Sequence, residues 1–72
     1  MKKVKKIIIK INGKVKLINY NTNLLKLVKN IKIPLKKVAI ELNQEIMNKK
    51  NLGRITLKKN DTIEIVHFIG GG

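Results

Sequence analysis

A chain of 72 residues has room for one small domain, and it is too short for a second domain or an enclosed active site. It contains no cysteine, which excludes disulfides and thiolate metal sites, leaves apolar packing alone to hold the fold, and suits a reducing compartment. No window reaches the roughly 18 uninterrupted apolar residues of a membrane span, and the lysine-rich start lacks the apolar stretch of a secretory signal. We therefore expect an intracellular protein, in the cytoplasm or, if an organelle encodes it, in a plastid stroma.

The formal net charge of +13 comes from 17 Lys and Arg residues against four acids, which raises the question of a nucleic acid or membrane partner. However, Lys, Ile and Asn supply 38 of the 72 residues. These three types share adenine- and thymine-rich codons, so a biased genome would produce this composition whatever the function. With one Arg, one Tyr and one Phe, the chain also offers few groups for bidentate or stacking contacts with bases. We expect neither nucleic acid nor membrane as a partner.

The first predicted element is a β-hairpin over residues 6–19. Before Asn12-Gly13, isoleucine occupies every second position on one face. The dipeptide tolerates the positive φ of a tight primed turn, which makes it a strong hairpin signal between two alternating runs. After the turn, Val15 and Leu17 continue the alternation, which predicts that Ile18 lies with Ile8 on the outward face of the sheet.

A short helix is predicted next, because apolar residues recur at the i, i+3, i+4, i+7 spacing of one helical face. These residues are Leu24, Leu27, Val28 and Ile31. The polar residues 21–23 supply N-cap oxygens, and Pro34 prevents the helix from continuing through it.

The rest of the chain alternates strands with polar turns. The expected elements are a strand over 38–42, a turn at 43–44, a brief strand at 46–47, a loop over 48–53, a short run at 55–57, a polar turn at 58–61 and a last strand from 62 to 67 or 68. One mixed sheet with the single helix packed on one face accounts for this order, so the fold class is an α+β roll. We expect a single domain over residues 1–72.

Several residues that suggest catalysis have simpler roles. His67 is the sole histidine and has no cysteine or acidic cluster beside it in the sequence, so we assign it a structural or partner-contact role. The four acids, Glu41, Glu45, Asp61 and Glu64, are scattered rather than paired, which argues against a general acid-base pair. No glycine-rich phosphate-binding motif is present. We therefore expect a chain that is not an enzyme and that binds no metal or cofactor itself.

The last strand leads into Gly70, Gly71 and Gly72. Glycines at this place are either a frayed end or the working part of the molecule. We expect residues 69–72 to form a flexible tail, which would project on the order of 13 Å beyond the last strand when fully extended. Because glycines lack a Cβ, such a tail can thread a narrow channel and approach another molecule closely.

Three stretches, TNLLKLV at 22–28, VAIELNQEI at 38–46 and DTIEIVHFIGGG at 61–72, together resemble the ThiS family of sulfur carrier proteins in thiazole synthesis for thiamine. The resemblance covers nearly the whole chain in order and length. It implies a β-grasp, ubiquitin-like fold and a monomer. The chain departs from the family at Asn48-Lys49, where a Pro-Arg pair is common, and in its far more basic surface.

The resemblance also implies a chemistry for Gly72. A ThiF-type adenylating enzyme would use Mg-ATP to turn its carboxylate into an acyl adenylate. Sulfur derived from a cysteine desulfurase would then leave a thiocarboxylate, which donates sulfur to the thiazole synthase ThiG. In this scheme Gly70 and Gly71 thread into the enzyme clefts.

Strand alternation adds a docking surface to this scheme. If Ile63 and Ile65 point to the core, Val66 and Phe68 lie on the opposite face of the last strand. We expect Val66, Phe68 and Ile69 to dock on both the adenylating enzyme and thiazole synthase.

Two alternatives remain open at this point. One is a MoaD-like or Urm-like β-grasp sulfur carrier or modifier for another pathway. The other, from a different class, is a small basic RNA-binding module whose glycines are incidental. Sequence-independent RNA affinity that falls steeply with salt, and that survives removal of Gly71 and Gly72, would support the second alternative.

Overall fold

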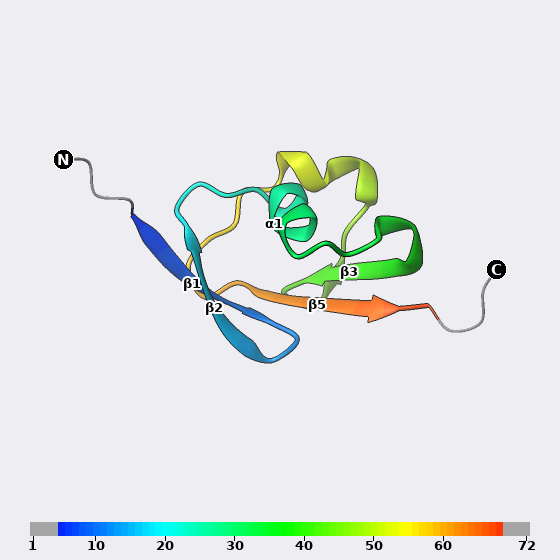
Figure 1. The fold of residues 1–72 in the computed structure, drawn as a ribbon, viewed down its shortest axis with the longest axis horizontal. Coiled ribbons are helices and arrows are strands. Elements are labelled where there is room, and N and C mark those ends of the chain that lie inside the picture. The colour runs from blue at the N-terminus through cyan, green and yellow to red at the C-terminus, as the bar shows by residue number, and fades with distance from the viewer. Residues whose placement is uncertain (1–4, 69–72) are drawn as a thin grey trace.

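A five-stranded mixed sheet lies against one α-helix in the computed structural model of the chain, which describes residues 5–68 (Figure 1). In chain order the elements are β1 (Lys6–Ile11), β2 (Lys14–Asn19), α1 (Leu24–Asn30), η1 (Leu35–Lys37), β3 (Val38–Leu42), β4 (Glu45–Ile46), η2 (Lys49–Arg54) and β5 (Thr62–His67), where η marks a 3-10 helix. The strands lie in the order β2-β1-β5-β3-β4. Only the β1-β5 pair is parallel within this sheet of residues 5–68. The predicted α+β roll is confirmed, and the last strand lies at its centre.

The hairpin between β1 and β2 forms as predicted, with Asn12 and Gly13 both at positive φ, 49° and 82°. The predicted outward position of Ile18 is wrong, because this side chain is only 8% exposed and packs in the core. The register explains the error. Cross-strand partners share a face of the sheet, and Ile18 lies opposite the inward-facing Ile7.

The same register turns two apolar residues of β2 toward solvent. Val15 is 65% exposed and Leu17 is 56% exposed on the outer face of the sheet, the face away from α1. Leu17 lies opposite Ile8, which is exposed as predicted. The outer face of the hairpin is therefore more apolar than the alternation predicts.

The helix α1 begins where the sequence supplies a cap. The Asn23 side chain accepts a hydrogen bond from the Lys26 backbone N–H at 2.7 Å, which satisfies one of the free donors of the first turn. Leu24, Leu27 and Val28 are buried against the sheet. The helix ends at Asn30, before Pro34, and the predicted helical face is confirmed.

The segment predicted as a loop over 48–53 is instead the 3-10 helix η2. Asn48 caps it by accepting a hydrogen bond from the Lys50 N–H at 2.9 Å, and Leu52 is fully buried. One apolar residue among polar neighbours carries no helical period, so the sequence pattern gives no sign of this element. The predicted run at 55–57 forms only an isolated bridge between Asn23 and Thr56, and the brief strand is Glu45–Ile46 rather than 46–47.

The core lies between the sheet and the layer formed by α1 and η2. Its buried side chains are Ile9, Ile18, Leu24, Leu27, Val28, Val38, Ile40, Leu52, Leu57, Ile63 and Ile65. Since they come from four strands, both helices and one loop, no single hairpin can bury this surface by itself.

Asn12 joins the hairpin turn to the last strand. Its backbone N–H donates to the Ile63 carbonyl at 2.9 Å. Its side-chain Oδ1 accepts from the Ile65 N–H at 2.7 Å, and its Nδ2 donates to the Ile65 carbonyl at 3.4 Å. The amide of Asn12 therefore continues the parallel β1-β5 ladder after the main chain has turned away.

Replacing Asn12 with glycine tests this role, because Asn12→Gly keeps the positive φ and removes both amide hydrogen bonds. We expect the free energy of unfolding to fall by about 1 to 2 kcal/mol, measured by chemical denaturation. The matched control is Asn60→Gly, at an exposed turn residue with a φ of 70°. Equal losses in the two variants would show that the amide of Asn12 contributes nothing beyond its backbone conformation.

Candidate docking site on the outer sheet face

The strand β5 presents one face to the core and the other to solvent. Ile63 and Ile65 are buried, whereas Glu64 and Val66 are exposed. Phe68 follows directly after the strand and is 60% exposed. The alternation predicted for this strand is therefore confirmed, and it brings the predicted docking residues Val66 and Phe68 to the surface.

Exposed apolar side chains gather on the outer face in two groups. The hairpin patch consists of Ile8, Val15 and Leu17, and the tail patch consists of Val66 and Phe68, whereas the exposed Ile46 lies two strands away from β5. Contiguous exposed apolar surface on so small a domain is typical of a site that binds another protein. The tail patch is the part that lies next to the end of the last strand.

Two contacts hold Phe68 at that end. Its backbone N–H donates to the Lys37 carbonyl at 2.9 Å, which extends the β3-β5 pairing by one residue. The Lys49 ammonium lies 5.3 Å from the centroid of the Phe68 ring, within the range of a cation-π contact. Lys49, which stands where the resemblance leads us to expect the arginine of a Pro-Arg pair, thus contacts Phe68, the aromatic residue predicted to dock.

The outer face also carries a pair of acids that the sequence did not predict. Glu41 on β3 lies directly opposite Glu64 on β5, although 22 residues separate them in the chain. The description of the acids as scattered is therefore wrong, since antiparallel pairing joins positions that look unrelated in sequence. Like charges at directly opposite positions destabilise a sheet. A cation supplied by a partner would remove that cost.

The remaining candidate residue, His67, lies at the end of β5. His67 is exposed and lies opposite Val38. Residues 5–68 contain no group of three or more His, Cys, Asp or Glu side chains that could hold a metal ion. Among the same residues, no helix has the length and apolar character needed to cross a membrane.

The tail itself is not part of this geometry. The predicted docking residue Ile69, the threading residues Gly70 and Gly71, and the predicted sulfur attachment residue Gly72 lie outside the described residues. The structure therefore places Val66 and Phe68 together at the exit of β5 and leaves the roles of these four residues as predictions.

Neighbouring substitutions in β5 test the assignment of its two faces. Ile65→Ala removes a buried side chain, so we expect the free energy of unfolding to fall by about 2 to 4 kcal/mol. Val66→Ala removes an exposed one, and we expect a change of at most about 0.5 kcal/mol. Thermal or chemical denaturation of both variants measures the difference. Comparable losses in the free energy of unfolding would mean that the Val66 side chain is buried and not exposed.

Comparison with known proteins gives one family. The model of the ThiS family matches residues 5–72. The sulfur carrier protein ThiS of Bacillus subtilis (strain 168) is 49% identical over 35 residues, which are 49% of this chain and 53% of that protein. A thiazole synthase of Magnetococcus marinus is 47% identical over 36 residues, which are 50% of this chain and only 11% of that protein. The matches thus span about half or less of these curated relatives.

A solved structure extends the similarity to the fold. The crystal structure of the thiamine biosynthesis protein ThiS from Geobacter metallireducens superposes with a TM-score of 0.81 at 28% identity. The superposition covers 92% of this chain and all of that one. This similarity confirms the β-grasp fold that the family resemblance implies.

Proposed function

Because the chain belongs to the ThiS family, we propose that it is a sulfur carrier of thiamine biosynthesis, loaded with sulfur on the carboxylate of Gly72. The observation that carries the proposal is the extent of the family match, which runs from residue 5 through the last strand to Gly72. The similarity of 35 residues to a protein named as a sulfur carrier supports it. In this function the partner enzymes bind the folded domain and perform the chemistry on its C-terminal tail.

The chemistry requires activation, since a carboxylate is a poor electrophile. An oxygen of the Gly72 carboxylate attacks the α-phosphorus of Mg-ATP in a ThiF-type enzyme, which releases pyrophosphate and leaves an acyl adenylate. The terminal sulfur of an enzyme persulfide, supplied by a cysteine desulfurase, attacks the acyl carbon and displaces AMP. A second enzyme thiol then reduces the resulting acyl disulfide, which leaves the thiocarboxylate on Gly72 and a disulfide on the enzyme. In this proposal the adenylating enzyme binds the nucleotide, and the chain acts as the substrate.

The described residues support this role by fixing where the tail begins. β5 is bonded on one side to β3 and on the other to β1 and the Asn12 amide. The bond from the Phe68 N–H to Lys37 holds the main chain up to the start of the tail. From that fixed point residues 69–72 span at most about 13 Å, so an enzyme that binds the tail patch receives Gly72 within a limited volume.

We assign the tail patch to the contact with the adenylating enzyme and with thiazole synthase. The match of 36 residues within a protein named thiazole synthase supports the second partner. Phe68 offers an exposed aromatic ring, the kind of side chain that dominates interface energetics. On the same face of the sheet, next to Val66, the paired Glu41 and Glu64 favour a partner surface that presents Arg or Lys to the sheet.

The loading reaction gives the direct test. After incubation with Mg-ATP, a ThiF-type enzyme and a cysteine desulfurase with cysteine, the intact mass should rise by the replacement of one oxygen with sulfur. We expect deletion of Gly72 to abolish the gain, and Gly71→Ala to slow it, because a Cβ obstructs a narrow channel. Circular dichroism should show that both variants keep the fold. No mass gain, with enzymes proven active on a known carrier, would refute the proposal.

A second experiment tests docking by comparing the two aromatic residues of the chain. Phe68→Ala should raise the Kd for the adenylating enzyme on the order of tenfold or more, as expected for an interface hot spot. The control is Tyr20→Ala, since Tyr20 is 57% exposed and also lies under a lysine ammonium, that of Lys5 at 4.7 Å. Isothermal titration calorimetry measures both affinities. Equal effects of the two substitutions would remove Phe68 from the docking surface.

A further inference from the structure

Within residues 5–68, the outer strand β2 has an open edge. The bond from the Tyr20 N–H to the Lys5 carbonyl, at 2.8 Å, sets the alternation by which even-numbered residues of β2 bond to β1. The N–H and C=O groups of Val15, Leu17 and Asn19 therefore point away from the sheet. One of these groups, the Asn19 carbonyl, accepts a hydrogen bond from the Thr22 hydroxyl at 2.6 Å. An edge of this kind is a template for one more strand.

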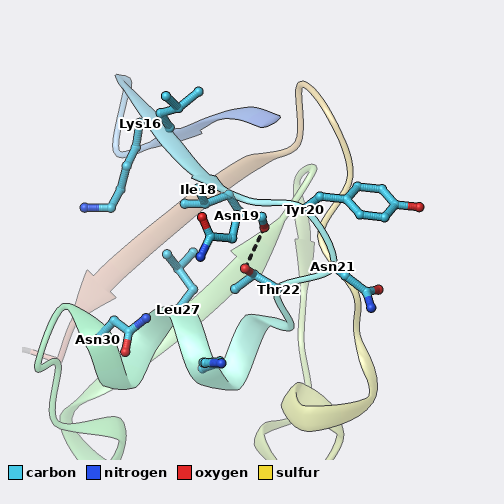
Figure 2. Close-up of a pocket in the computed structure, with 10 residues that line it drawn as sticks. Lys16, Ile18, Asn19, Tyr20, Asn21, Thr22, Leu27 and Asn30 are labelled. Carbon is cyan, nitrogen blue, oxygen red and sulfur yellow. Dashed lines mark hydrogen bonds between the residues drawn. The ribbon is translucent and has the colours of Figure 1, made fainter. Parts of the chain in front are cut away.

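A cavity runs along that edge between β2 and α1. Its volume is about 440 Å³, and Ile18 and Leu27 contribute buried apolar surface to it (Figure 2). Lys16 lines it from β2, and Asn30 lines it from α1. Tyr20 points away from it, so the open side of the cavity is not closed by the aromatic ring. The strand edge thus adjoins a space large enough to receive side chains of an added strand.

The charges around this edge indicate which kind of protein segment could bind there. Lys14 and Lys16 lie on the inner face of β2, Lys26 lines the cavity from α1, and none of the four acids of the chain lies on either element. On the outer face of the same strand, Val15 and Leu17 are exposed. A strand added here would place alternate side chains beside lysines and beside apolar residues.

We propose that the β2-α1 edge binds an extended segment of a partner protein, by strand addition, in which acidic and apolar residues alternate. The acidic side chains would lie over the cavity beside Lys16 and Lys26, and the apolar ones beside Val15 and Leu17. A second copy of this chain is a poorer occupant, because pairing β2 with β2 would bring the lysines of the two copies together. The site is separate from the tail patch, since β1 lies between β2 and β5.

The proposal is tested with a synthetic peptide, acetyl-Glu-Val-Glu-Val-Glu-Val-Glu-amide, titrated into the ¹⁵N-labelled full chain. We expect the amide resonances of Val15, Leu17 and Asn19 to shift, and the amide hydrogens of Val15 and Leu17 to exchange more slowly with solvent. A peptide of the same composition with its glutamates in one block is the sequence control. Two further versions carry N-methyl groups on every valine or on every glutamate, and only one of them should lose binding, because alternate N–H groups face β2.

The charge contribution is tested by reversing lysines. The double variant Lys16→Glu, Lys26→Glu should weaken binding of the alternating peptide by about tenfold at low salt. The control, Lys36→Glu with Lys59→Glu, makes the same change in net charge on residues outside the cavity, and it should weaken binding far less. Well-dispersed spectra establish that each variant is folded.

Three outcomes would overturn the proposal. The first is equal binding of the alternating, block and both N-methylated peptides, which would reduce the contact to non-specific charge attraction. The second is a set of shifts centred on Val66 and Phe68 instead of β2. The third is the absence of any shift with the peptide while a uridine oligonucleotide shifts the β2 amides, which would assign the edge to nucleic acid.

Discussion

The parallel pairing of β1 with β5 is the constraint on which the rest of the structure depends. β2 and β3 both run antiparallel to this central pair, so the chain between them must cross from one end of the sheet to the other. That connection contains α1, which lies with the later η2 on one face, and the described residues leave the outer face bare (Figure 1). The last strand is thereby held on both sides, and the Asn12 amide extends that hold to Ile65. A rigid base for a short tail follows directly from this topology.

The bare face explains why a domain with a sound core still exposes large apolar side chains. Burial of Ile63 and Ile65 requires Val66 and Phe68 to point outward, and burial of Ile18 requires the same of Leu17. Polar residues at those outward positions would leave the core unchanged, so the exposed apolar side chains are not a requirement of packing. The simplest physical role for them is contact with other molecules.

The sequence predicts those parts of this architecture that rest on local signals. Asn12-Gly13 with its flanking alternation gives the hairpin, and the spacing of Leu24, Leu27 and Val28 gives the helix. Predictions fail where the structure depends on strand pairing or on one buried side chain. Ile18 faces inward because of its partner on β1, and Glu41 meets Glu64 only through the β3-β5 register. Leu52 is the single buried residue of η2, so no periodic pattern in the sequence predicts that element. The cavity beside β2 could not be predicted either, because it depends on where α1 packs.

The two surfaces suit a carrier that must visit more than one enzyme. Under the proposed function, contact through the tail patch would have to be broken whenever the tail moves from the activating enzyme to the acceptor, so this contact could not be very tight at either enzyme. A strand added at β2 would leave Phe68 and the end of β5 uncovered, because β1 lies between the two strands. A partner holding that edge would then keep the tail near a reaction centre at a high effective concentration while the tail patch exchanges freely. In this arrangement the lysines of β2 and α1 would bind acidic side chains of one partner segment. The two acids on the outer sheet face would instead favour basic side chains of a partner.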